Sequence, residues 1–172
     1  MTTGAGGGQG ANPEADLVRV TTVVPVDPAT AFALFTEEVD AWWRRGPRYR
    51  FGDGTMRFEP PPRGRLVEVY DEAAGDLHVV GEVSAWEPGR RLAFAWRGAR
   101  FAPGEETHVE VRFERVAAGT RVTVEHRGWE ALPPDHPARH GLTGGAFTSM
   151  IGLWWGELLT MLRAHAAARD AS

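Results

Sequence analysis

Apolar residues between positions 138 and 168 recur every three to four residues, the period of an amphipathic α-helix. We therefore predict a long C-terminal helix over about residues 138–168. Its buried face is expected to carry Phe147, Met150, Ile151, Trp154, Leu158, Met161, Leu162 and His165. Its opposite face carries small and polar residues, which are Thr148, Ser149, Gly152, Gly156, Thr160 and Arg163. Trp155 and Glu157 lie on the two flanks.

Upstream of this helix, apolar and polar residues alternate with the period of two that is typical of half-buried strands. The predicted strands cover residues 17–24, 55–59, 65–70, 78–86, 91–96, 107–115 and 120–127. Short turns separate the last six, which indicates an antiparallel meander rather than βαβ units. The last three strands have one apolar and one charged face, so the sheet is expected to pack on one side only. The inward face of the 78–86 strand is left open.

Two short helices are predicted between the first and second strands. Asp27 and Pro28 form a helix start signal, with a capping acceptor followed by proline at the first helical position. Residues 39–43 form a second helical turn, and Trp42 and Trp43 are expected to plug the open end of a curved sheet. The predicted class is α+β: a curved antiparallel β-sheet wrapped around a long C-terminal α-helix.

Composition sets the domain organisation and excludes several functions. Residues 1–15 are rich in glycine and nearly free of apolar side chains, so they are expected to be a disordered tail before a single domain at 16–170. The absence of cysteine excludes disulfides, thiolate zinc sites and cysteine nucleophiles. A net charge of −4 argues against nonspecific binding of nucleic acid. Neither a membrane span nor a signal peptide is evident, so a cytoplasmic location is expected.

Seven arginines cluster in the stretch between the second short helix and the third strand. They are Arg44, Arg45, Arg48, Arg50, Arg57, Arg63 and Arg65. This stretch is either a solvated loop, which we favour, or a basic patch that attracts an anionic ligand.

Four local motifs, together with the order of the elements, carry a family resemblance. They are VDPATAF at 26–32, GEVSAWEPGRRL at 81–92, HRGWE at 126–130 and WGELL at 155–159. Over about residues 17–168 the chain resembles the helix-grip proteins of the START-like (SRPBCC) superfamily, within the group related to the activator of Hsp90 ATPase. The resemblance implies a helix-grip fold with a hydrophobic cavity between the sheet and the long helix, which members use for lipids, polyketides and other apolar molecules.

Twelve residues are candidates for the wall of that cavity, because bulky rings that face one another across a curved sheet and a helix tend to leave irregular space. They are Trp42, Trp43, Phe58, Phe94, Trp96, Phe113, His126, Trp129, Phe147, Met150, Ile151 and Trp154. For any single member, a place in the core is the more common role.

The chemistry of a catalytic or metal site is incomplete in the sequence. His126 ends an apolar strand face and Glu82 lies on a strand of undecided orientation, so these two are the candidates for an acid or base. His136 and His140 have a spacing that suits metal ligands, but Pro137 separates them and no third ligand is evident. We therefore predict no metal and no cofactor.

The favoured interpretation is a protein that binds a small, largely apolar ligand, with no partner nucleic acid. An alternative is a cyclase or aromatase that acts on an aromatic or polyketide substrate, with His126 or Glu82 as acid or base. A chaperone partner is less expected, because the resembling co-chaperones carry an additional N-terminal domain and only a short glycine-rich tail precedes the first strand here. Gly152 and Gly156 leave open a homodimer through the back of the long helix.

Overall fold

The computed structural model describes residues 16–172, and the predicted disordered tail at 1–15 lies outside the described residues. The strands are β1 (Val18–Val24), β2 (Thr55–Glu59), β3 (Arg65–Asp71), β4 (Asp76–Glu87), β5 (Arg91–Trp96), β6 (Thr107–Val116) and β7 (Gly119–Arg127). The helices are α1 (Pro28–Thr36), α2 (Val39–Trp42), the 3-10 helices η1 (Trp129–Ala131) and η2 (Pro137–Arg139), and α3 (Gly144–Asp170). Every predicted strand is present, within two residues of its predicted ends.

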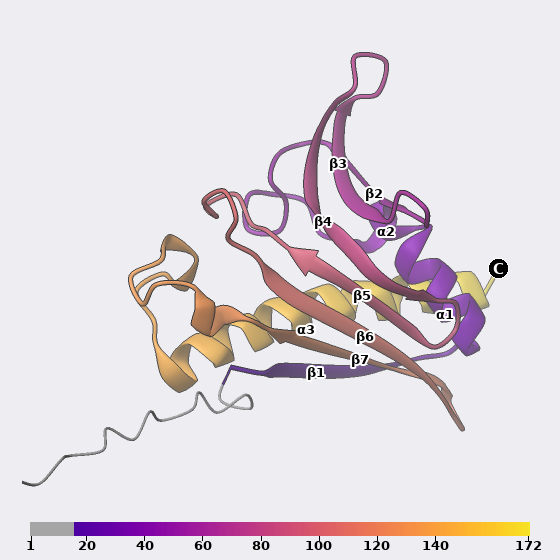
Figure 1. Cartoon of the computed structure of the whole chain (residues 1–172). Helices are drawn as coiled ribbons and strands as arrows, with labels where there is room; N and C mark the ends of the chain where they lie inside the picture. The colour runs from indigo at the N-terminus through magenta and orange to yellow at the C-terminus, as the bar shows by residue number, and fades with distance from the viewer. Residues whose placement is uncertain (1–15) are drawn as a thin grey trace, which may run out of the picture.

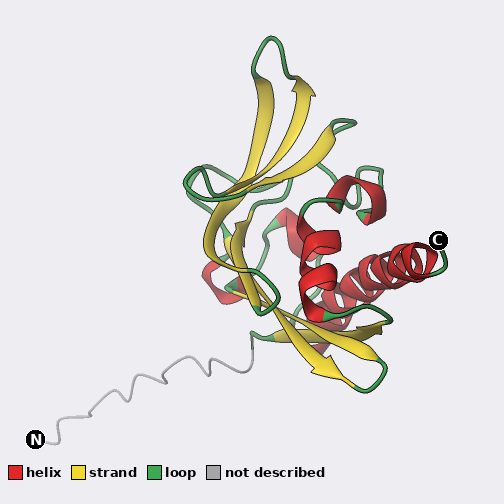
Figure 2. Cartoon of the chain, turned by 90° about the vertical axis from the view of Figure 1, so that its right-hand side faces the viewer, coloured by secondary structure: helices red, strands yellow, loops and turns green. Residues whose placement is uncertain are grey.

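The seven strands form one antiparallel sheet in the order β1-β7-β6-β5-β4-β3-β2. The sheet curves around α3, and α1 lies against the C-terminal half of that helix (Figures 1 and 2). Along β1, β7 and β6 only one face of the sheet is packed, because the other carries arginines and glutamates that pair with each other. Glu125, for example, lies 3.1 Å from Arg19 and 2.6 Å from Arg127. The predicted α+β class with a curved sheet around a C-terminal helix is confirmed.

Strand β4 bends, which explains why its inward face could not be read from the sequence. Its first half pairs with β3 and its second half pairs with β5, with register shifts in both ladders. Gly81 sits at the bend, where a Cβ atom would lie 1.7 Å from the carbonyl oxygen of Ala95. A strand that changes partners does not keep one alternation of buried and exposed positions. Val80 is buried and Glu82 is exposed.

The first short helix follows its predicted start signal. The Asp27 carboxylate accepts a hydrogen bond from the backbone N–H of Thr30 at 2.9 Å, as an N-cap does. The pKa of Asp27 is lowered, first by this backbone hydrogen bond and then by the Thr30 hydroxyl. Phe32 and Phe35 point inward from α1, and Trp42 and Trp43 are both 1% exposed. The four aromatic residues form part of one continuous core.

The prediction that the long helix begins at about residue 138 was wrong. Residues 137–139 form a separate 3-10 turn, and His140 then takes a left-handed conformation with φ of 49°. Gly141 and Gly144 also have positive φ, so the backbone turns sharply before α3 begins at Gly144. The helical spacing of apolar residues extends upstream of Gly144, but residues with positive φ keep that segment out of the helix. A hydrophobic pattern does not show such backbone conformations, so it placed the start of the helix too early.

The buried stripe of α3 is rotated relative to its predicted position. Trp155, predicted on a flank, is fully buried, whereas Met161, predicted inside, is 40% exposed. The buried residues are Phe147, Ile151, Trp155, Leu158, Leu159, Leu162 and Ala166. Steps of three or four residues take the stripe from Phe147 and Ile151 through Trp155 to Leu158, and they leave Trp154 half-buried beside it.

Candidate functional site

A pocket of about 540 Å³ opens at one end of the space between α3 and the sheet. The N-terminal half of α3 forms its floor together with the end of β7, and three loops surround its mouth. These loops join α2 to β2, β5 to β6, and β7 to α3. The lining residues are Pro47, Arg48, Trp96, Gly98, Ala99, Arg100, Phe101, His126, Trp129, Ala138, His140, Met150, Ile151 and Trp154.

Trp154 fixes one wall of the pocket. Its indole Nε1–H donates to the carbonyl oxygen of Arg48 at 2.8 Å, and its ring stacks on Tyr49 with centroids 6.0 Å apart. Trp43 and Trp96 meet the same indole edge-on at 5.9 and 5.5 Å. Because each ring is held by others from different elements, this wall is a rigid aromatic surface.

His126 lies at the base of the pocket and is 1% exposed. Trp155 Nε1–H can only donate, so its 3.0 Å contact with Nδ1 of His126 makes that nitrogen an acceptor. The ring proton is therefore on Nε2, which donates to the Thr107 hydroxyl at 2.7 Å. That hydroxyl lies 3.3 Å from the carbonyl oxygen of Trp96 and donates to it. Both ring nitrogens are occupied within the protein.

The electrostatics of His126 agree with a structural role. Burial, which disfavours the imidazolium, and to a lesser extent His108, lower the pKa of His126 to about 3. The ring is neutral at neutral pH, and both of its nitrogens are already in hydrogen bonds. An acid or base needs a free nitrogen within reach of the substrate. This arrangement therefore does not favour His126 as the acid or base of a cyclase.

The two loops on the far side of the mouth are joined to each other. His136 Nε2 lies 3.0 Å from the carboxylate of Glu105, and the Phe101 ring meets Trp129 edge-on at 6.2 Å. The pKa of Glu105 is lowered, first by the backbone N–H of Ala102 and then by His136. The β5–β6 loop and the β7–α3 connection thus form one wall rather than two separate flaps.

The α2–β2 loop is held by two buried charged residues. The Arg50 side chain is fully buried and reaches Asp40 at 2.5 Å and the carbonyl oxygen of Gly54 at 3.1 Å. Glu68, also fully buried, accepts hydrogen bonds from three backbone amides of the same loop. Partial burial opposes ionisation of Asp40, but hydrogen bonds from the Met56 amide and Arg50 keep its pKa below the ordinary value. The loop is therefore fixed where it meets the pocket.

The arginine-rich stretch is an ion-paired segment. Each of its seven arginines lies within 4 Å of a carboxylate, and these carboxylates come from Asp40, Glu59, Glu72 and Glu157. Arg48 is the one member of the stretch that also lines the larger pocket.

The structure divides the twelve predicted cavity residues into two groups. The pocket lining includes Trp96, His126, Trp129, Met150, Ile151 and Trp154. The buried core, away from that lining, contains Trp42, Trp43, Phe58, Phe94, Phe113 and Phe147. Some members of the second group fill the space between the sheet and α1. Others pack against lining residues: Trp43 against Trp96 and Trp154, and Phe147 against Trp129.

The sequence interpretation did not identify the loop residues of the pocket. They are Pro47, Arg48, Gly98, Ala99, Arg100, Phe101, Ala138 and His140. Loops have no periodicity that marks an inward side. Two signals were available: Phe101, a large apolar residue within a segment rich in glycine and charge, and Arg48, a member of the arginine-rich stretch.

Other predicted chemistry can now be located. Glu82 is exposed and outside the pocket lining. Within residues 16–172, no three histidines or carboxylates gather in a way that could hold a metal ion. None of the helices described is both long and apolar enough to cross a bilayer. A Cβ atom at Gly152 would contact Val18 of β1 at 3.9 Å, so Gly152 lies close to the protein's own sheet.

A curved antiparallel sheet that wraps a long C-terminal helix, with short helices after the first strand, defines a helix-grip protein. The particular family follows from the sequence. The family model described as Activator of Hsp90 ATPase homolog 1-like protein matches residues 25–164, and the chain belongs to this family. The resemblance seen in the sequence motifs is confirmed. The comparison with curated proteins gave no match.

Solved structures show the same fold at low sequence identity. Protein MLL2253 from Mesorhizobium loti has a TM-score of 0.60 at 18% identity, covering 89% of this chain and 97% of that one. The AHSA1-like protein from Aeromonas hydrophila has a TM-score of 0.60 at 12% identity, with coverages of 91% and 95%. DynU16, from the dynemicin biosynthetic locus, has a TM-score of 0.57 at 22% identity, with coverages of 87% and 46%.

Proposed function

We propose that the protein binds a small, largely apolar molecule in the pocket between the N-terminal half of α3 and the three loops. The observation that carries this proposal is the aromatic wall around a space of about 540 Å³. That volume lies within the range of ordinary small-molecule sites, which are mostly apolar with a few polar groups.

Binding is favoured over turnover by the placement of the acid and base candidates. His126 uses both ring nitrogens within the fold, and Glu82 is exposed outside the pocket. A cyclase would have to move protons with His140, the other histidine of the lining.

The proposal is tested with phenylnaphthylamine, a neutral fluorescent probe with an aromatic body. Met150→Trp places a larger side chain in the pocket and is expected to weaken probe binding about tenfold, or 1.4 kcal/mol. Leu153→Trp is the matched control, since Leu153 is 69% exposed on the same helix and outside the lining. It should leave the dissociation constant unchanged. Saturable binding that responds equally to both substitutions, or no saturable binding, would contradict the proposal.

A further inference from the structure

The ionisable residues in the pocket lining are all arginine or histidine. They are Arg48, Arg100, His126 and His140. No aspartate or glutamate contributes to the lining, although the chain has 23 acidic residues and only 19 arginines. His126 is neutral and buried at the base, so the positive charge of the wall comes from the mouth.

Arg100 is the cation with the fewest partners at the mouth. It is exposed in the β5–β6 loop, and none of the ion pairs formed within residues 16–172 includes it. The two acidic residues of this loop, Glu105 and Glu106, lie outside the pocket lining, and Glu105 is directed to His136 and to the Ala102 amide. The neighbouring Arg97 is held by backbone carbonyls rather than by a carboxylate. The loop therefore places Arg100, and neither of its two glutamates, in the lining of the apolar space.

The opposite side of the mouth has the same sign of charge. Arg48 and Arg44 share one carboxylate, Glu157, at 3.7 and 3.9 Å. Glu157 also accepts the hydroxyl hydrogen of Tyr49. One carboxylate for two arginines leaves this side of the mouth net positive, and both arginines also lie over the Tyr49 ring.

We infer that the pocket selects organic anions: molecules with a flat aromatic body that lies against Trp96, Trp129 and Trp154, and an acidic group held at the mouth by Arg100 and Arg48. The inference rests on the proposed function, because it specifies the ligand of the same pocket. Arginine suits a carboxylate, sulfonate or phosphate because its planar fork matches their oxygens. Positive charge at the mouth of an apolar cavity also attracts anions from solution.

Two probes that share an aromatic body separate this inference from the proposed function. Anilinonaphthalene sulfonate carries a sulfonate that phenylnaphthylamine lacks. Arg100→Gln is expected to raise the dissociation constant of the sulfonate about fivefold, the size of an exposed ion pair. The constant for phenylnaphthylamine should stay within about twofold, as for an ordinary surface substitution. Arg100→Glu should weaken sulfonate binding further than Arg100→Gln.

Arg90→Gln is the matched control. Arg90 is exposed in the β4–β5 turn, at the opposite end of β5 from the pocket, and should affect neither probe. Added salt should weaken sulfonate binding more in the wild-type protein than in Arg100→Gln.

The outcomes are distinguishable. If phenylnaphthylamine does not bind in the pocket, the proposed function fails. If both probes bind but Arg100→Gln affects neither, or affects both equally, the proposed function stands and the selection of anions is overturned.

Discussion

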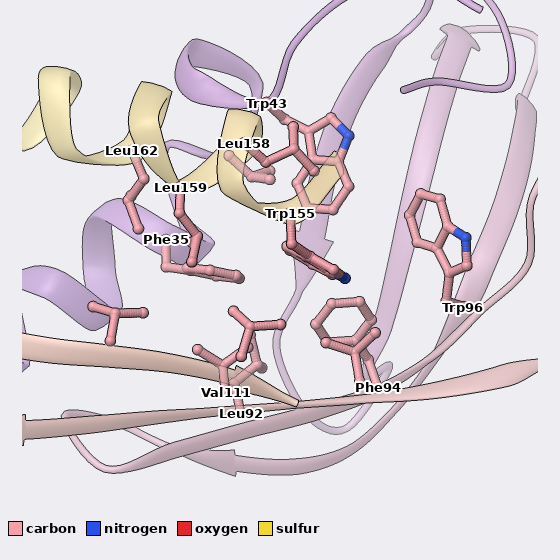
Figure 3. Packing of buried hydrophobic residues seen from close by; sticks show 14 of the residues in the cluster. Phe35, Trp43, Leu92, Phe94, Trp96, Val111, Trp155, Leu158, Leu159 and Leu162 are labelled. Atoms are coloured by element: carbon pink, nitrogen blue, oxygen red, sulfur yellow. The ribbon is translucent and has the colours of Figure 1, made fainter. Parts of the chain in front are cut away.

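The two ends of the space between α3 and the sheet are built from different partners. At the C-terminal end of the helix, Leu159 and Leu162 point toward Phe35 of α1 and toward Leu92 and Val111 of the sheet (Figure 3). All five side chains are at most 1% exposed. At the N-terminal end, none of the α-helices within residues 16–172 is inserted between α3 and the sheet, and loops with the short 3-10 helices η1 and η2 surround the pocket instead.

The difference shows what closes a helix-grip interior. A helix such as α1 presents a continuous apolar face that fills the space at the density of a protein core. The connections around this mouth contribute two large rings, Phe101 and Trp129, and otherwise small apolar residues, which are Pro47, Gly98, Ala99 and Ala138. The same sheet and the same helix therefore make a solid core where α1 is inserted and a pocket where loops replace it.

The largest expected loss of stability comes from a comparison of two neighbouring tryptophans, one in the core and one on the pocket wall. Trp155→Ala removes a fully buried ring and the donor to His126, so the free energy of unfolding should fall by about 3–5 kcal/mol. Trp154→Ala removes a half-buried ring on the pocket wall and should cost about 2 kcal/mol. Urea denaturation measures both. Equal losses, or a larger loss for Trp154, would contradict the division into core and wall.

This pair of tryptophans also shows what the sequence could predict. Alternation located every strand within two residues, and the signal at Asp27 located the start of α1. The helical period could not decide between Trp154 and Trp155, because a rotation of one residue keeps most of the apolar face inside. His140 could not be recognised as left-handed, so the helix start was misplaced.

The pocket was less predictable than the fold because half of its wall comes from loops, whose side-chain directions follow no sequence period. The predicted rings on β5, β7 and α3 reach it because regular elements impose a direction on their side chains. Arg100 and Phe101 belong to a loop, and their direction depends on contacts such as that between Glu105 and His136. Those contacts are nonlocal, so the sequence pattern carries no signal for them.

A second, intermediate effect is the dependence of stability on pH that His126, at the bottom of the pocket, should cause. The pKa of His126 is lowered from 6.5 to about 3, so in acid the unfolded chain binds a proton that the folded protein does not. Protonation of His126 should therefore leave the free energy of unfolding unchanged above pH 6.5 and should lower it as the pH drops below 6.5. Between these two pKa values, His126 should lower the free energy of unfolding by about 1.4 kcal/mol for each unit by which the pH falls.

The measurement is the free energy of unfolding at several pH values between 7 and 4. Carboxylates also titrate in this range, so the wild-type protein is compared with His126→Gln. That side chain can accept from Trp155 and donate to Thr107, but it does not titrate. The pH dependence should be weaker in His126→Gln by the slope given above. Parallel curves would mean that His126 is accessible to protons in the folded state.

The smallest expected effect on stability is that of Met150→Ala, and its comparison with Leu162→Ala separates the two ends most directly. Met150→Ala and Leu162→Ala remove the same number of heavy atoms from one helix. Met150 is half-buried in the pocket wall, so its truncation enlarges a space that already exists and should cost about 1 kcal/mol. Leu162 is 1% exposed in solid core, so its truncation leaves a new cavity and should cost about 2–5 kcal/mol.

Probe binding should follow the opposite order in these two variants. Met150→Ala removes contact surface for phenylnaphthylamine and should weaken its binding about threefold, whereas Leu162→Ala should leave it unchanged because Leu162 lies outside the lining. Calorimetry and fluorescence titration of both variants measure the two quantities independently. If Leu162→Ala weakened probe binding as much as Met150→Ala, packing changes at one end of the helix would be transmitted to the other. The division into a packed core at α1 and a separate pocket would then be wrong.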